Sequence, residues 1–235
     1  MKKRSVYTVD GQRVPGVTSI IGAIDKSAAL VPWAARMATD SVRDVWKAGV
    51  SYSEDQIEST LEIAKRAHSV RKTDAGAAGT NVHELIGAFI EGQLKPENMS
   101  NPKERLIVEN FQLVTQGWKW LASEVVVLHK TELYGGTADS LAVLPNEMRV
   151  IPDWKTSKNV YASFSLQIAM YAAAEPMDER LREEWKKVKE GRILHYNADR
   201  HTWEVLEIEL ESQYPYIPAV RKMYQWKKEF DSQWH

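Results

Sequence analysis

The sequence lacks cysteine, long apolar runs and an excess of charge of either sign. Without a single Cys among 235 residues, it can form no disulfide and no thiolate-held zinc or iron–sulfur site. Since no run of 18 apolar residues occurs, we expect no membrane span, and the basic first ten residues lack a signal peptide's apolar stretch. The 31 Lys and Arg against 32 Asp and Glu argue against a uniformly basic surface. We expect a soluble cytoplasmic protein whose chemistry comes from carboxylates, His, Lys and hydroxyls.

Hydrophobic periodicity separates helical from extended parts of the chain. Asp10-Gly11 between two short alternating runs predicts a hairpin over residues 6–14. Residues 27–75 have helical composition, and the small residues 76–80 are expected to begin a further helix. Beyond these we expect helices over 101–120, 161–174, 178–190 and 212–230, strands over 124–129, 137–144 and 148–155, and a second hairpin within 193–210. The pattern predicts an α+β fold, with a central mixed, mainly antiparallel sheet flanked by helices and an N-terminal helical extension.

The central hairpin brings two acidic residues together. If Asn146 lies at the middle of its turn, strand partners sum to 292, which places Asp139 opposite Asp153. Carboxylates on directly opposed residues would lie close enough to repel each other, unless a proton or cation lies between them. A divalent cation with oxygen ligands is the natural solution, although a shift of one residue would separate the two side chains.

Lys155 lies on the same side of its strand as Asp153, because side chains alternate along a strand. An ammonium beside a metal-binding carboxylate can orient an attacking water or stabilise charge on a phosphate. The alternative for an isolated Asp-x-Lys tripeptide is an ordinary surface salt bridge.

Several further motifs accompany this tripeptide in a fixed order. They are Gly79-Thr80-Asn81-Val82-His83, an acidic residue Glu124, Gly135-Gly136-Thr137-Ala138-Asp139, Asp153-Trp154-Lys155-Thr156-Ser157, and Gln167 with Tyr171. This set resembles the RecB-like branch of the PD-(D/E)XK nuclease superfamily. The segment 14–21, Val-Pro-Gly-Val-Thr-Ser-Ile-Ile, is similar to the start of phage exonucleases and mitochondrial genome-maintenance exonucleases of this kind. Pro152-Asp153 is not the family's "PD", whose acid corresponds to Asp139, and the lack of Cys separates the chain from relatives with an iron–sulfur cluster.

The resemblance implies a restriction-endonuclease-like fold and a site for one or two Mg²⁺ or Mn²⁺ ions. It implies a single nuclease domain over residues 1–235, with a helical wall or arch over 27–75, a catalytic core over 76–175, and a C-terminal hairpin and helix over 191–230. The implied metal ligands are His83, Asp139, Asp153 and the carbonyl of Trp154. The implied catalytic residues are Lys155, Asp139, Asp153, Glu124, Gln167 and Tyr171.

Each of these roles has a structural alternative. His83 alone would be an ordinary core or surface histidine, Glu124 a plain strand-end glutamate, and Tyr171 a core residue. Candidate substrate contacts are Thr156, Ser157, Arg66, Arg71, Lys72 and Lys158. Thr156 and Ser157 have a second interpretation, as caps of the following helix.

The resulting hypothesis is a metal-dependent DNA exonuclease acting on single-stranded or free DNA ends in replication, recombination or repair. Its expected location is the cytoplasm of a bacterial or phage-infected cell, without membrane association. The alternatives are an endonuclease of the same fold, a non-catalytic DNA-binding recombination accessory protein, and a metal-dependent hydrolase of another substrate.

Overall fold

The computed structural model describes residues 6–24 and 27–234, which form two compact units. The first unit holds the described residues up to Ile24 and from Asn81 onward, and the second holds those between 27 and 80. No helix in the described part of the chain is long and apolar enough to cross a membrane. The helices are α1 (Val17–Ile21), α2 (Ser27–Val45), α3 (Glu54–Ile90), α4 (Pro102–Val114), α5 (Ala162–Ala173), α6 (Arg182–Trp185) and α7 (Tyr216–Trp234), with 3-10 turns at Pro96–Asn98 and Glu179–Leu181.

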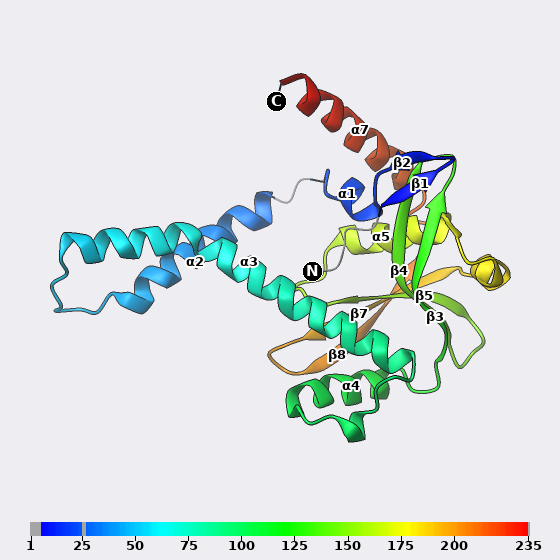
Figure 1. Cartoon of the computed structure of the whole chain (residues 1–235), viewed down its shortest axis with the longest axis horizontal. Helices are drawn as coiled ribbons and strands as arrows, with labels where there is room; N and C mark the ends of the chain where they lie inside the picture. Colours follow the sequence, from blue (N-terminus) through cyan, green and yellow to red (C-terminus); the bar gives the residue numbers. More distant parts are fainter. Residues whose placement is uncertain (1–5, 25–26, 235) are drawn as a thin grey trace. The chain divides into compact units, whose positions relative to one another are not determined.

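The first unit contains a six-stranded mixed sheet with the strand order β6-β3-β4-β5-β7-β8 (Figure 1). Neighbouring strands are antiparallel except β5 and β7, which run parallel. The α+β class and the mixed, mainly antiparallel sheet flanked by helices are therefore confirmed. The strands are β3 (Lys119–His129), β4 (Tyr134–Val143), β5 (Arg149–Lys155), β6 (Glu175–Pro176), β7 (Glu190–Asn197) and β8 (Thr202–Glu209), while β1 (Tyr7–Val9) and β2 (Gln12–Val14) form a separate hairpin.

The β4–β5 hairpin has the predicted register next to its turn but not at the two aspartates. Ala142 pairs with Val150, a sum of 292 as predicted, and the N–H of Leu144 donates to the carbonyl of Met148. In an antiparallel pair every second pair of opposed residues is hydrogen-bonded, and here these are the pairs of even-numbered residues. The next hydrogen bond of the ladder would therefore need the N–H of residue 152. Pro152 has no N–H, and the pairing of β4 with β5 ends at Val150.

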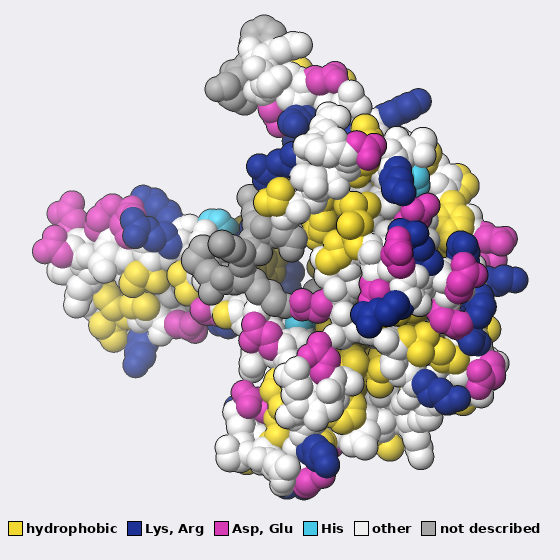
Figure 2. Space-filling model, turned by 45° about the vertical axis from the view of Figure 1, so that its right-hand side comes forward, with side chains coloured by type: hydrophobic (Ala, Val, Ile, Leu, Met, Phe, Trp, Pro, Cys, Tyr) yellow, Lys and Arg dark blue, Asp and Glu magenta, His cyan; other side chains and the backbone are white. Residues whose placement is uncertain are grey.

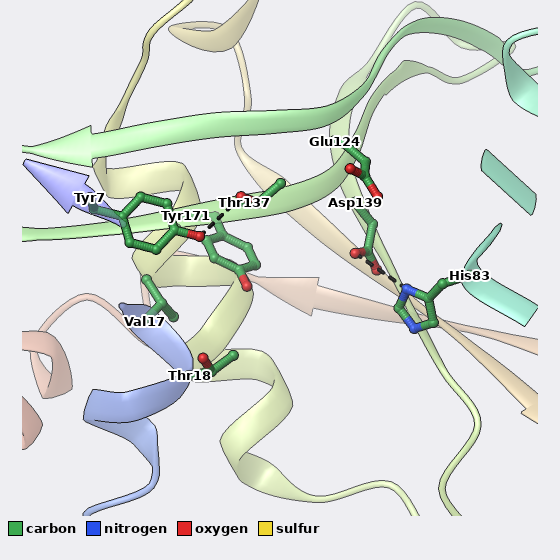
Figure 3. A pocket seen from close by; sticks show the side chains of 9 residues that line it. Tyr7, Val17, Thr18, His83, Glu124, Thr137, Asp139 and Tyr171 are labelled. Atoms are coloured by element: carbon green, nitrogen blue, oxygen red, sulfur yellow. Dashed lines mark hydrogen bonds and ion pairs between the residues drawn. The ribbon is translucent and has the colours of Figure 1, made fainter. Parts of the chain in front are cut away.

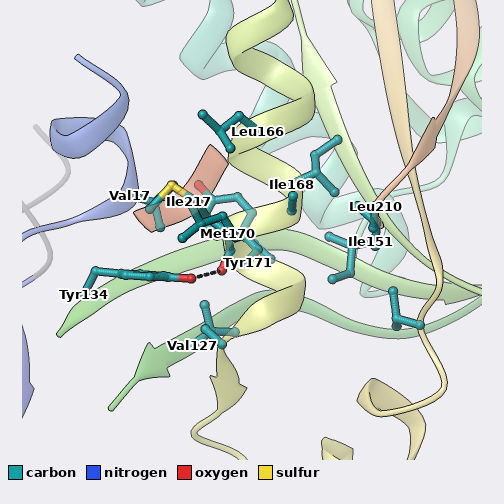
Figure 4. Packing of buried hydrophobic residues seen from close by; sticks show 14 of the residues in the cluster. Val17, Val127, Tyr134, Ile151, Leu166, Ile168, Met170, Tyr171, Leu210 and Ile217 are labelled. Atoms are coloured by element: carbon teal, nitrogen blue, oxygen red, sulfur yellow. Dashed lines mark hydrogen bonds between the residues drawn. The ribbon is translucent and has the colours of Figure 1, made fainter. Parts of the chain in front are cut away.

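Two apolar layers cover the two faces of the sheet. On one face, α1, α5 and α7 pack against β3, β4 and β5 through residues such as Val17, Met170 and Ile217 (Figure 4). Within this layer the hydroxyl of the fully buried Tyr134 donates to the carbonyl of Met170 at 2.8 Å. On the other face, the end of α3 and the apolar side of α4 pack around Phe111 and Trp154. Trp154 therefore points away from the face that carries Ile151.

The second unit is a pair of helices, α2 and the first part of α3. A capping box begins α3, because the Ser53 hydroxyl accepts from the Gln56 N–H and the Gln56 side chain accepts from the Ser53 N–H. The helix start expected at residues 76–80 is wrong, since α3 continues unbroken from Glu54 to Ile90. Gly76 lies inside the helix, where glycine lowers helix propensity relative to alanine without preventing the helix.

Two other helix predictions were too long. The helix expected over 101–120 ends at Val114, and Gly117, with a φ of +80°, leads into β3 at Lys119. The charged stretch 178–190 forms only one short 3-10 turn and the four-residue α6, after which β7 begins at Glu190. Sheet pairing of Glu190 with both Val150 and Glu209 outweighs the helical preference of its neighbours.

Candidate functional site

Asp153 and Lys155 form a buried ion pair on β5. The Lys155 Nζ lies 2.5 Å from the Asp153 Oδ2, and their side chains are 15% and 1% exposed. The alternative of a surface salt bridge is thus excluded. The ammonium also lies 5.0 Å from the centroid of the Phe164 ring on α5, a cation–π contact. The predicted pairing of these two side chains on one face of the strand is confirmed.

Asp139 on β4 joins this pair to α3. Its Oδ1 lies 3.6 Å from Nδ1 of His83, and its Oδ2 accepts a 3.0 Å hydrogen bond from the backbone N–H of Trp154. The register arithmetic expected Asp139 and Asp153 to be strand partners, but the pairing of β4 with β5 does not extend to them. Because the pairing of β4 with β5 does not continue past Pro152, the N–H of Trp154 donates to the Asp139 carboxylate instead of to a β4 carbonyl.

The two carboxyl groups have opposite pKa shifts. Burial raises the pKa of Asp153 to about 6, with the charge of Asp139 acting in the same direction and the Lys155 ammonium opposing it. Burial also acts to raise the pKa of Asp139, but the hydrogen bond and charge of His83, together with Lys155 and the Trp154 N–H, lower it overall. His83, both aspartates and Lys155 thus act on one another as a single electrostatic cluster.

Glu124 faces this cluster from β3 with an unusual backbone conformation. It lies between the pairs Ser123–Ser140 and Val125–Ala138, which places it opposite Asp139. Its φ of +48° is in the left-handed region, which non-glycine residues rarely adopt and which is found more often at functional sites. The expectation that Glu124 begins the strand is wrong, because β3 begins five residues earlier.

A hollow of about 240 Å³ lies beside these acidic residues (Figure 3). Its walls include Glu124, Asp139 and His83 on one side, and aromatic and hydroxyl side chains on the other. These others are Tyr7, Thr18, Thr137 and Tyr171. The hydroxyls of Tyr7 and Thr137 are hydrogen-bonded at 3.0 Å, which attaches the β1–β2 hairpin to β4.

The two glycines of the Gly135-Gly136-Thr137 motif are required by close ring contacts. A Cβ on Gly135 would lie 2.5 Å from Tyr7, and a Cβ on Gly136 would lie 2.5 Å from the Tyr171 ring. The hydroxyl of Tyr171 accepts a 2.8 Å hydrogen bond from the side-chain amide of Gln167, one turn earlier on α5. The glycines therefore let two tyrosines lie against β4 at the edge of the hollow.

The segment after Lys155 is held by a histidine. His195 on β7 lies beside Lys155 in the parallel register, and its Nε2 is 2.6 Å from the carbonyl oxygen of Ser157. The hydroxyl of Ser157 donates to the carbonyl of Asn159. The capping interpretation of Thr156 and Ser157 is wrong, because α5 has Tyr161 at its N-cap position, without a side-chain cap from any described residue. Their role toward a substrate stays a prediction, as does that of the exposed Lys158.

Three predicted substrate contacts belong to the second unit. Arg66, Arg71 and Lys72 all have exposed side chains on the part of α3 before Thr80. Each remains a candidate for contact with a polyanion.

The donor atoms around the hollow are those that bind hard divalent cations. Within the described residues, no three His, Asp or Glu side chains are already arranged as a metal-binding group. However, Oδ2 of Asp153 is buried and lies 2.5 Å from the Lys155 ammonium, with which it forms an ion pair. A buried carboxylate whose pKa is affected by a second carboxylate and an imidazole fits a Mg²⁺ or Mn²⁺ ligand set.

Sequence reasoning did not identify Tyr7, Thr18, Thr137 and His195 as parts of the site. The adjacent Gly135 and Gly136 were a usable signal, because glycine inside a strand marks a close approach of another group. His195 carries no such signal, since its role depends on the parallel pairing of β5 with β7, far apart in the sequence.

Comparisons with known proteins give little information about this chain. No protein family and no curated protein matches the sequence. A solved structure described as "Crystal structure of SSO0001" is similar with a TM-score of 0.36 and 12% identity, over 80% of this chain and 81% of that chain. A similarity of this degree supports no conclusion about fold family or function.

Proposed function

We propose that the protein is a divalent-metal-dependent DNA exonuclease with a restriction-endonuclease-like fold of the RecB-like type. The observation that carries this proposal is the buried cluster of Asp139, Asp153 and Lys155, with His83 on the opposite side of Asp139. A buried carboxylate with a raised pKa beside an ammonium lowers the stability of the folded protein, which a purely structural core would not favour. The same arrangement is suited to hydrolysis of a phosphodiester.

Asp139, Asp153 and His83 would hold the metal, with Glu124 and the Trp154 carbonyl as further candidates. When bound, Mg²⁺ or Mn²⁺ would supply a water of lowered pKa and neutralise charge on the scissile phosphate. The Trp154 N–H orients the Asp139 carboxylate, and burial keeps the Asp153 oxygens away from solvent. Lys155 would align the attacking water or stabilise the negative charge that develops on the phosphate.

The hydrogen-bonded Gln167 and Tyr171 would limit where the substrate can lie. Tyr171 is nearly fully buried and packs against Gly136, so its hydroxyl has a fixed position at the wall of the hollow. Fixed groups of this kind contribute to catalysis by positioning the reacting atoms. No covalent intermediate with the enzyme is required.

Cleavage of labelled DNA tests this function. The wild-type protein should degrade linear DNA labelled at the 5′ or 3′ end in Mg²⁺ or Mn²⁺, and EDTA should stop the reaction. Circular single-stranded DNA should resist, whereas its cleavage would indicate an endonuclease of the same fold. Binding without cleavage in any divalent ion would favour the non-catalytic accessory protein. Neither binding nor cleavage of DNA would overturn the proposal.

A further inference from the structure

Three hollows of the first unit adjoin one another. The hollow at the site shares Tyr7 and Thr18 with a larger hollow of about 650 Å³. This second hollow shares Ser19, Tyr224 and Lys228 with a third hollow of about 250 Å³. A continuous row therefore leads from the buried carboxylates, past the β1–β2 hairpin and α1, to α7.

The charge of the lining side chains changes along this row. The hollow at the site is lined by Glu124 and Asp139. The second hollow has Arg13 and Lys228 and, among the described residues, no carboxylate in its lining. The third has Lys227 and Lys228 against the single Asp231. Lys and Arg side chains, with Asp and Glu side chains beside some of them, are visible in the upper part of Figure 2.

Two aromatic rings in fixed positions line the second hollow. Tyr7 is held against Gly135 and hydrogen-bonded to Thr137, so it separates the first hollow from the second. The ring of Tyr224 lies 5.8 Å from the guanidinium of Arg221, whose Nε donates to a backbone carbonyl at 2.9 Å. Fixed aromatic rings between cationic side chains are the usual elements of a groove that binds single-stranded nucleic acid.

We propose that this row of hollows is a binding track for one nucleic-acid strand. The inference rests on the proposed function, which gives the first hollow the scissile phosphate. The strand leaves the site between Tyr7 and Thr18 and continues over α1. Its bases lie against Tyr7 and Tyr224, and its phosphates contact Arg13, Lys227 and Lys228. In this proposal the basic side chains of α7 bind the substrate. A single strand is favoured, because unpaired bases can stack on tyrosine rings.

Oligonucleotide binding in EDTA tests the track separately from cleavage. The probe is fluorescein-labelled oligothymidylate, and its affinity is measured by fluorescence anisotropy over a series of salt concentrations. In the variant Lys227→Glu/Lys228→Glu we expect affinity to fall by roughly tenfold or more, and the salt dependence to decrease by about two phosphate contacts. The matched control Lys103→Glu/Lys186→Glu makes the same charge change on α4 and after α6, outside the track, and should bind almost as the wild type does.

Kinetics separate the track from the reaction itself. In Mn²⁺ the Lys227→Glu/Lys228→Glu variant should show a raised KM and an unchanged kcat, because both lysines lie away from the carboxylates. Arg13→Glu, on a different element, should weaken oligonucleotide binding in the same way. These side chains are exposed, so each variant should unfold at the same temperature as the wild type. Equal unfolding temperatures would establish that the fold is intact.

The outcomes distinguish the track from the proposed function. Wild-type affinity in both Lys227→Glu/Lys228→Glu and Arg13→Glu would overturn the track, while metal-dependent cleavage by the same samples would leave the proposed function intact. A wild-type protein that neither binds nor cleaves DNA would overturn both. If the lysine variant instead lost binding to phosphatidylserine vesicles and kept its oligonucleotide affinity, the surface would belong to a membrane and the track would be wrong.

Discussion

The ammonium of Lys155 lies 2.5 Å from a carboxylate oxygen of Asp153 that is almost completely excluded from solvent. The two residues are neighbours on one face of β5, so the strand itself fixes their pairing. Burial of an ion pair gives little net stability, because desolvation offsets the attraction. The raised pKa of Asp153 indicates that the attraction does not fully compensate here. We therefore interpret the pair as an arrangement kept for chemistry, and the following predictions depend on it.

The first prediction is that Asp153→Asn stabilises the metal-free protein while it abolishes cleavage. Asn resembles the protonated carboxyl group, and the pKa of Asp153 rises from 3.8 to about 6 on folding. At about 1.4 kcal/mol per pKa unit, the ionised carboxylate costs on the order of 3 kcal/mol at neutral pH. Urea unfolding in EDTA at pH 7.5 measures the difference. A variant that unfolds at lower urea than the wild type contradicts the prediction.

The second prediction is the pH dependence of that difference. Because the folded pKa of Asp153 is raised, the folded state binds more protons than the unfolded state between about pH 4 and 6. The two proteins should therefore have similar free energies of unfolding near pH 4. As pH rises, the wild type should become less stable than Asp153→Asn, and the difference should level off above about pH 7. Asp139, whose pKa is lowered, loses its contribution only as pH falls below its ordinary range. Unfolding titrations of both proteins in EDTA test the shape, and a constant difference would contradict it.

The third prediction concerns Lys155. Lys155→Met removes the ammonium but keeps much of the aliphatic side chain against Phe164, so the fold should remain. Turnover of DNA in Mn²⁺ should fall by at least about 100-fold, the usual loss for a group that stabilises developing charge. The control Lys189→Met removes an exposed charge just before β7, at a residue outside the predicted site, and should retain turnover within a few-fold. Similar turnover in both variants would remove Lys155 from the site.

The fourth prediction tests the reason for the double glycine. In Gly136→Ala the added methyl group would lie 2.5 Å from the Tyr171 ring, which has no room to move because it is buried and hydrogen-bonded. We expect a loss of about 1–3 kcal/mol of unfolding free energy. In Gly87→Ala, inside α3, the methyl group meets no described atom within 4 Å, and stability should rise by about 0.5–1 kcal/mol. Thermal unfolding of the two variants should thus shift in opposite directions.

Local patterns in the sequence were sufficient for most of the sheet and for the charged pair. Alternation along β5 predicted Asp153 and Lys155 on one face, and the Asn146 turn gave the correct register at Ala142 and Val150. The predicted strand pairing of Asp139 with Asp153 was wrong, because it extended that register through Pro152, which has no N–H to donate between the strands.

Other features depend on contacts that a local pattern does not contain. The stretch before Glu190 has helical composition, but pairing with two strands makes Glu190 the start of β7. Tyr7 reaches the site only because the hairpin packs over Gly135, more than 100 residues later in the sequence. The positive φ of Glu124 likewise has no counterpart in the local pattern of residues.

Manganese binding in the absence of DNA tests the central claim most directly. Calorimetric titration of the wild-type protein with Mn²⁺ at pH 7.5 should show binding of one or two ions. Asp139→Asn and Asp153→Asn should each weaken that binding by at least about tenfold, because each removes a charged oxygen ligand. His83→Ala should weaken it less, because it removes a neutral ligand. Binding that is equal in the wild type and both aspartate variants, or no binding by the wild type, would contradict a metal site between these carboxylates.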